Sequence, residues 1–141
     1  MKNKLTATTS ININASSSKI WDALTTPELI KQYFFGTETV TDWKVGSPIH
    51  FKGTWEGKEY LDKGIILEII PEKLLRYSYL SSFSGLEDKT ENYANVTYSI
   101  TIEPTGTKLT VIQDNIDSEE KVLHSTQGWE MVLNGLKKLV E

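Results

Sequence analysis

Four polar side chains that could bind or react with a ligand lie in stretches that otherwise have the pattern of buried strand faces. Tyr77 and Tyr79 alternate with Leu75 in LLRYSYL, while Tyr98 lies in NVTYSITI and Gln113 ends KLTVIQ. A buried hydroxyl or amide costs free energy unless it has a hydrogen-bonding partner. Two interpretations remain open. These groups either bond to one another, to backbone or to water in a filled core, or they line a cavity and orient a ligand.

The cavity interpretation adds apolar residues from neighbouring predicted elements to these four polar groups. An apolar pocket with a few orienting polar groups is typical of a small-molecule site. In this interpretation the Tyr79 hydroxyl orients the ligand and closes no core hydrogen bond. The candidate ligand-binding residues are Phe51, Leu67, Tyr77, Tyr79, Tyr98, Gln113, Trp129 and Val132.

Other kinds of site have weaker support. The two histidines of the chain, His50 and His124, have no second ligand at the spacing of a metal site, so we expect no metal and no other cofactor. The segment GLEDKT lacks the glycine that precedes the lysine of a phosphate-binding loop. No G-x-S-x-G nucleophile motif occurs. We therefore expect no catalytic residues, and we assign Glu119 and Glu120 to the electrostatics of a helix N-terminus.

Composition predicts an ordinary globular protein. Its 141 residues suit one domain, expected to span residues 1–141. The net charge of −4 argues against a nucleic-acid partner, which would need a basic surface. No run approaches the roughly 18 apolar residues of a membrane span, so no membrane insertion is expected. The absence of cysteine fits a reducing compartment, and we expect a cytoplasmic location.

The segment SSSKIWDALTTPELIKQYFFG predicts two short helices after a first strand. Serines at 16–18 offer N-cap oxygens for the first helix, and Thr26 followed by Pro27 offers a second start. Gly36 is a plausible helix stop. The expected packing residues of the two helices are Ile20, Trp21, Leu24, Leu29, Ile30, Tyr33 and Phe34.

Alternating apolar and polar residues between short turns predict an antiparallel meander from Val40 to Gln113. The segment Leu5–Asn14 has the same period and is expected to be an edge or pairing strand. The polar segment between Leu80 and Tyr93 exceeds the length of a hairpin loop, and is expected to be a flexible loop or a lid. One side of the strand within YLDKGIILEII is expected to carry Leu61, Ile65, Leu67 and Ile69.

After Asp117 the apolar period becomes helical. The pattern predicts a terminal helix from about Ser118 to Val140, about 33 Å long, which can cross a whole curved sheet. A strand, two short helices, an antiparallel meander and one long helix together indicate an α+β fold, in which a curved sheet wraps around the last helix.

The segments that form this pattern also resemble a known family. SSSKIWDALTTPELIKQYF, TDWKVGSPIHFKG, DKGIILEIIPEKLLRYSY, GTKLTVIQ and GWEMVLNGLKKLVE are similar, in this order, to bacterial members of the family named after the activator of heat shock protein 90 ATPase, homologue 1. That family belongs to the START-like, helix-grip superfamily of ligand-binding cavities. The resemblance covers nearly the whole chain. It implies a START-like fold and a hydrophobic or amphipathic small-molecule ligand, but fold alone does not fix function.

Three functional hypotheses follow. The first is a non-catalytic binder of an apolar or aromatic metabolite or a lipid. The second is an enzyme of the cyclase or hydratase kind found in related helix-grip proteins, with a cavity tyrosine or His124 as general acid. The third is a stress-related co-chaperone that stimulates a heat shock protein 90 ATPase. The eukaryotic namesake's extra N-terminal domain and its Asn-Asn-Trp-His-Trp type motif do not occur in this sequence, so a chaperone partner is not supported.

Overall fold

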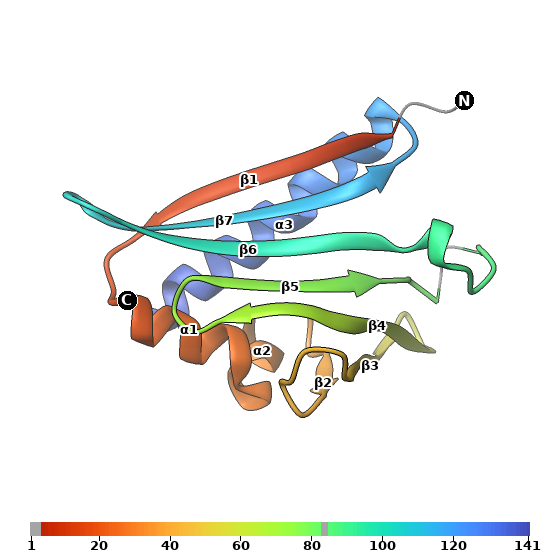
Figure 1. The fold of residues 1–141 in the computed structure, drawn as a ribbon, viewed down its shortest axis with the longest axis horizontal. Helices are drawn as coiled ribbons and strands as arrows, with labels where there is room; N and C mark the ends of the chain where they lie inside the picture. Colours follow the sequence, from red (N-terminus) through yellow and green to blue (C-terminus); the bar gives the residue numbers. More distant parts are fainter. Residues whose placement is uncertain (1–3, 83–84) are drawn as a thin grey trace.

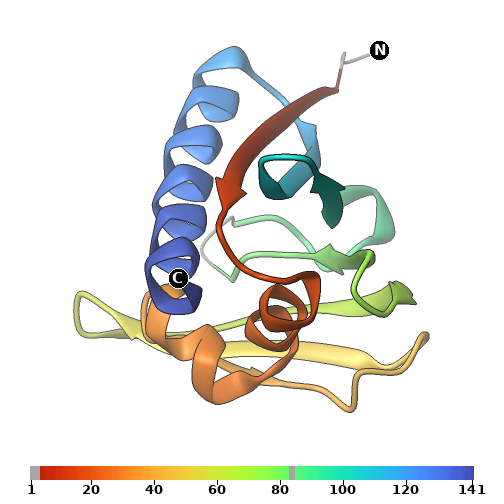
Figure 2. The ribbon, with the colours of Figure 1, turned by 90° about the vertical axis from the view of Figure 1, so that its left-hand side faces the viewer.

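A curved antiparallel sheet and one long helix form most of the computed structural model, which describes residues 4–82 and 85–141 (Figure 1). Seen from the side, the sheet curves around α3, and α1 and α2 lie beside the C-terminal end of that helix (Figure 2). The α+β, helix-grip architecture expected from the sequence is confirmed. In chain order the elements are β1 (Leu5–Ile13), α1 (Ser17–Thr25), α2 (Pro27–Tyr33), β2 (Glu38–Val40), β3 (Pro48–Trp55), β4 (Lys58–Ile70), β5 (Leu74–Tyr79), the short 3-10 helix η1 (Thr90–Asn92), β6 (Ala94–Glu103), β7 (Gly106–Ile116) and α3 (Glu119–Val140).

The strands are arranged in the order β1-β7-β6-β5-β4-β3-β2, and each neighbouring pair is antiparallel. Strands β2 to β7 therefore form the expected meander. Strand β1 joins it at the β7 edge, where Ile11 pairs with Leu109. Residues 83–84 of the expected loop or lid lie outside the described residues.

Local capping signals set the boundaries of α1 and α2. The Ser16 hydroxyl accepts a hydrogen bond from the backbone N–H of Lys19 at 3.1 Å, which satisfies one free donor of the first turn of α1. Pro27 occupies the first turn of α2, where its missing N–H costs nothing. Gly36 has a φ of +74°, which terminates the second helix in the left-handed region. The two-helix prediction is therefore confirmed.

Helix α3 is fixed to the rest of the fold through its C-terminal half. Its buried residues, Val132, Leu133, Leu136 and Val140, all belong to that half. The Lys137 ammonium donates to the backbone oxygen of Asn12 at 3.1 Å, and the backbone N–H of Asn14 donates to the Glu141 carboxylate at 2.8 Å. These bonds tie the end of the helix to the end of β1. The N-terminal half is therefore free to form one wall of a cavity.

The inner face of β4 differs from the sequence-based expectation. Glu56 and Gly57 both have positive φ and form a two-residue turn, so Trp55 pairs with Lys58 and Phe51 pairs with Asp62. Directly paired residues share one face of a sheet, and Asp62 therefore points inward with Phe51.

The opposite face of β4 points to solvent, and it carries three of the four residues that were expected to share one side of this strand. Leu61 and Ile65 are each 48% exposed, and Leu67 is 41% exposed. A register shift between Ile66 and Glu68 returns Ile69 to the core. The assignment of Leu67 to an internal ligand site is therefore wrong.

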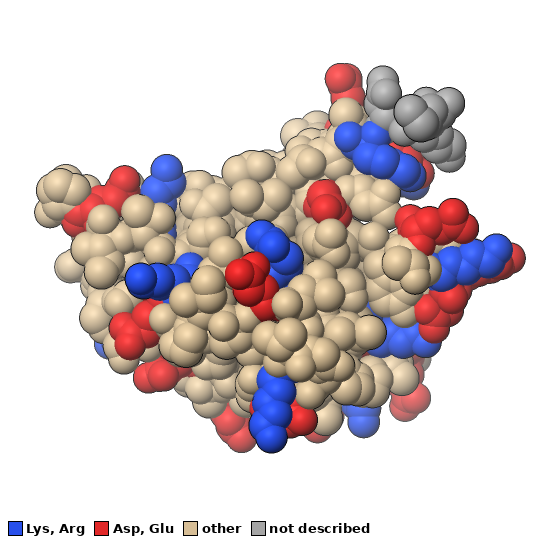
Figure 3. Space-filling view, in the orientation of Figure 1, with Lys and Arg blue, Asp and Glu red and all other residues tan. Residues whose placement is uncertain are grey.

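On the outer face of the sheet, acidic and basic side chains are interspersed (Figure 3). One exposed pair on this face joins Arg76 to Glu68 at 3.1 Å. Among the described residues, no helix is long and apolar enough to cross a membrane.

Candidate ligand-binding cavity

A cavity of about 570 Å³ lies between the inner face of the sheet and the N-terminal half of α3. Its volume falls within the roughly 300–1,000 Å³ of typical small-molecule sites. Aromatic side chains form much of its wall, and Phe35, which is 59% exposed, lies at its mouth with the exposed His124. The lining residues are Phe34, Phe35, Thr37, Phe51, Tyr60, Asp62, Tyr77, Tyr79, Ser81, Val96, Gln113, His124, Ser125, Gly128, Trp129 and Val132.

The structure brings six of the eight sequence-predicted residues into this wall. Tyr98 is buried immediately behind it, where its ring packs edge-to-face on Trp129 at a centroid distance of 5.9 Å. Leu67 lies on the outer face of β4, away from the cavity. The six predicted residues that line the cavity are Phe51, Tyr77, Tyr79, Gln113, Trp129 and Val132.

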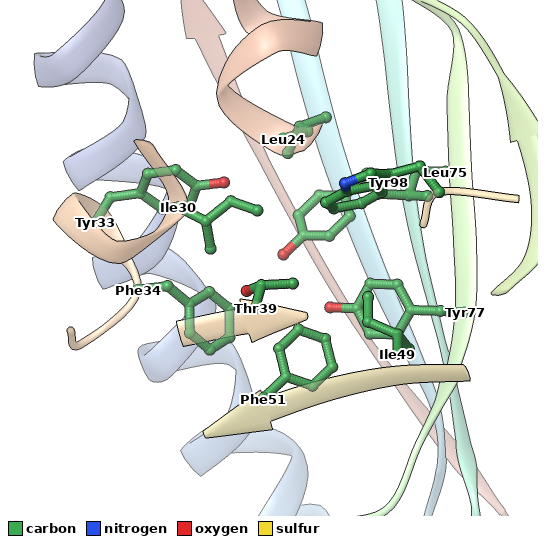
Figure 4. A pocket seen from close by; sticks show the side chains of 11 residues that line it. Leu24, Ile30, Tyr33, Phe34, Thr39, Ile49, Phe51, Leu75, Tyr77 and Tyr98 are labelled. Atoms are coloured by element: carbon green, nitrogen blue, oxygen red, sulfur yellow. The ribbon is translucent and has the colours of Figure 1, made fainter. Parts of the chain in front are cut away.

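Tyr98 belongs instead to a second, smaller cavity of about 20 Å³ (Figure 4). The Tyr33, Tyr77 and Tyr98 side chains converge on it with Thr39. The Tyr33 hydroxyl donates to the backbone oxygen of Ala23 at 2.8 Å, which ties α2 to α1. This volume is close to that of a single water molecule and excludes a metabolite. The small cavity is therefore part of the core, and the large one is the candidate site.

One face of α3 supplies the helical wall of the large cavity. Ser125, Gly128, Trp129 and Val132 follow the i, i+3, i+4, i+7 spacing of a single helical face. The Trp129 indole N–H donates to the side-chain oxygen of Gln113 on β7 at 2.9 Å. This bond fixes the indole against the sheet and gives the half-buried amide oxygen of Gln113 a donor.

A buried carboxylate, which sequence analysis missed, anchors the opposite wall. Asp62 is 7% exposed. Its Oδ2 accepts a hydrogen bond from the Tyr79 hydroxyl, and its Oδ1 accepts from the Ser82 backbone N–H at 2.7 Å and the Ser82 hydroxyl at 3.0 Å. Burial and the adjacent Asp62 charge raise the pKa of Tyr79 far above its usual value. The Tyr79 hydroxyl thus closes an internal hydrogen bond, contrary to the expected ligand-orienting role.

Tyr79→Phe is consequently expected to cost stability. Loss of the hydroxyl leaves the buried Asp62 carboxylate with one donor fewer, which should lower the free energy of unfolding by about 1.5–3 kcal/mol. Urea denaturation midpoints measure the change. Tyr93→Phe is the matched control, because its hydroxyl also donates to an aspartate, Asp88, but that carboxylate is 52% exposed and pairs with Lys63. Equal midpoints for wild type and Tyr79→Phe would contradict the assignment.

Two residues missed from the predicted lining, Asp62 and His124, carry recognisable sequence signals. His124 precedes Gly128 by four residues and Val132 by eight, so the helical period alone places it on the cavity face. For Asp62 the signal is the two-residue hairpin at Glu56 and Gly57, which fixes it opposite Phe51.

Comparison with known proteins agrees with this architecture. The family model for Activator of Hsp90 ATPase homolog 1-like proteins matches residues 14–141. The solution structure of ChR145 from Cytophaga hutchinsonii is 45% identical with a TM-score of 0.85, and the match covers 99% of this chain and 95% of that one. No functionally curated protein gives a significant match.

More distant solved structures share the fold. The solution structure of the Aha1 dimer from Colwellia psychrerythraea is 20% identical with a TM-score of 0.76, and the match covers 97% of this chain and 96% of that one. CalU16 from Micromonospora echinospora is 21% identical with a TM-score of 0.73, covering 100% and 87% of the two chains. At these identities the likeness concerns the fold alone.

Proposed function

Because this chain belongs to the Activator of Hsp90 ATPase homolog 1-like family and contains a large internal cavity, we propose that it binds a hydrophobic or amphipathic small molecule and releases it unchanged. The observation that carries the proposal is the cavity of about 570 Å³ between sheet and α3. Protein interiors are close-packed, so a filled core leaves no space of this size. A lipid or an aromatic metabolite fits the chemistry of the wall, where apolar and aromatic faces surround a few polar groups.

The state of these polar groups supports binding without catalysis. The Tyr79 hydroxyl already donates a hydrogen bond to Asp62, and the Trp129 indole N–H already donates one to Gln113. Burial raises the pKa of Tyr77 far above its usual value, although a hydrogen bond from Tyr98 opposes the shift. A phenol with a raised pKa gives up its proton less readily and is a poor general acid at neutral pH.

Titration with N-phenyl-1-naphthylamine, an uncharged probe that fluoresces in apolar surroundings, tests the proposal. Trp129 is only partly buried and its ring lines the cavity, so Trp129→Ala should weaken probe binding about tenfold, or about 1.4 kcal/mol. Its free energy of unfolding should fall by less than the ~3 kcal/mol typical of a filled aromatic core site. Denaturant midpoints measure the second quantity.

Leu133→Ala is the control from the same helix. Leu133 is 1% exposed and does not line the cavity, so its truncation should cost about 2–5 kcal/mol of stability and leave probe affinity unchanged. Failure of the wild type to bind the probe would refute the proposal, and a Trp129→Ala loss of stability as large as that of Leu133→Ala would show that the indole is packed in a solid core.

A further inference from the structure

The charge of the cavity wall narrows the class of ligand, provided that the proposed function holds. Asp62 lines the cavity, and its three described donors come from Tyr79 and Ser82. All three donors are neutral groups. They satisfy carboxylate lone pairs but do not cancel the negative charge.

None of the described lining residues is Lys or Arg, so no fixed cation among them balances this charge. Lys63, the next residue in β4, alternates to the other face of the strand, where its ammonium pairs with Asp88. His124 is the one described lining residue that can gain a positive charge, and it lies at the exposed mouth. A molecule in the inner part of the cavity therefore meets a net negative environment.

The aromatic residues next to Asp62 also favour a positively charged ligand. Phe51 is the cross-strand partner of Asp62, and its ring lies 5.7 Å from that of Tyr79 and 5.4 Å from that of Tyr77, centroid to centroid. The faces of aromatic rings carry partial negative charge and attract cations. Both effects are stronger in a site of low dielectric than in water.

We propose that the cavity selects amphipathic amines and rejects carboxylates such as fatty acids. The ammonium group lies toward Asp62 and the surrounding rings, and the apolar part of the ligand packs on Trp129 and Val132. An alcohol with the same apolar part binds with intermediate affinity, because it can donate to Asp62 but carries no charge.

Three ligands with the same ten-carbon chain test the order of affinity. Decylamine, decanol and decanoate are used to displace N-phenyl-1-naphthylamine at pH 8, above the range in which histidine ordinarily carries a proton. The buffer contains 0.5 M NaCl, which largely screens the exposed charges. We expect decylamine to bind more tightly than decanol, and at least tenfold more tightly than decanoate.

Asp62→Asn removes the charge but keeps a polar group of the same shape. The tenfold preference for decylamine over decanoate should then disappear. Glu130→Gln is the matched control, because it changes the net charge equally at an exposed position of α3 that does not line the cavity. This variant should retain the wild-type order.

The outcomes separate the two proposals. If the neutral probe does not bind the wild type, the proposed function itself is refuted. If the probe binds but decanol or decanoate equals decylamine, only the selectivity for amines is overturned, as it also is if Asp62→Asn retains the full preference. Should Asp62→Asn fail to fold, the wild-type order of affinities alone decides.

Discussion

Gly64→Ala is expected to lower the free energy of unfolding by about 4 kcal/mol or more, a loss reached by few single substitutions. A Cβ at Gly64 would lie 1.6 Å from the backbone oxygen of Ser78 on β5. A backbone carbonyl cannot rotate away as a side chain can, so the two strands must separate. Separation would break the bonds that flank this point, including that from the Leu80 N–H to the Lys63 oxygen at 2.8 Å. Urea denaturation followed by far-UV circular dichroism measures the loss.

Gly128→Ala makes the same chemical change, but it is expected to raise the stability and not to lower it. A Cβ at Gly128 meets no atom within 4 Å, and alanine favours a helix interior by about 0.5–1 kcal/mol over glycine. This variant should be slightly more stable than wild type. If Gly64→Ala were as stable as Gly128→Ala, the close approach of β4 and β5 would be disproved.

Alkaline pH is expected to unfold the protein in a steep transition. Burial raises the pKa of each of four tyrosines, and for Tyr79 the Asp62 charge adds to the effect. Below about pH 10 these tyrosines are protonated in both the folded and the unfolded state, and their contribution to stability is fully present. Above it, unfolded tyrosines release protons that folded ones retain, so stability falls until the folded pKa values are reached. The four are Tyr33, Tyr77, Tyr79 and Tyr98.

The size of this effect sets where the transition occurs. Each of the four groups contributes a loss of about 1.4 kcal/mol per pH unit above 10. Together they remove about 5.5 kcal/mol per unit, so a domain with a stability of ~5–15 kcal/mol should unfold about one to three units above pH 10. Absorbance at 295 nm should show these tyrosines ionising together with the loss of circular dichroism. On alkaline unfolding, the Tyr77→Phe variant should release one proton fewer than the wild type. Ionisation of all six tyrosines near pH 10 in a still folded chain would contradict the assignment.

Elements with local signals could be predicted from the sequence. The α3 boundary follows from Ser118, whose hydroxyl accepts from the Lys121 N–H at 3.2 Å, and the α2 boundary follows from Pro27. Both depend on residues within one turn of the helix end. The alternation around Tyr77 likewise placed one face of β5 in the core, because that strand has a single regular period.

Features that depend on distant residues could not be predicted in the same way. The alternation in β4 placed Leu61 and Leu67 on one side of the strand, and Leu67 was assigned to the cavity wall. The opposite face, which carries Asp62, lies inside instead, because Tyr79 and Ser82, 17 and 20 residues away, supply donors to the carboxylate. The same distant contact changed the role assigned to the Tyr79 hydroxyl.

The division of α3 into a packed C-terminal half and a cavity-lining N-terminal half has a thermodynamic consequence. All of its fully buried residues lie at Val132 or beyond, and in the turns before it only partly buried side chains such as Trp129 pack on the core. A molecule bound against Trp129 would supply further apolar contacts to these turns, and these contacts would be lost when it dissociates. Binding and the ordering of these turns would then be linked equilibria, and mass action would make the stability of the helix depend on ligand concentration.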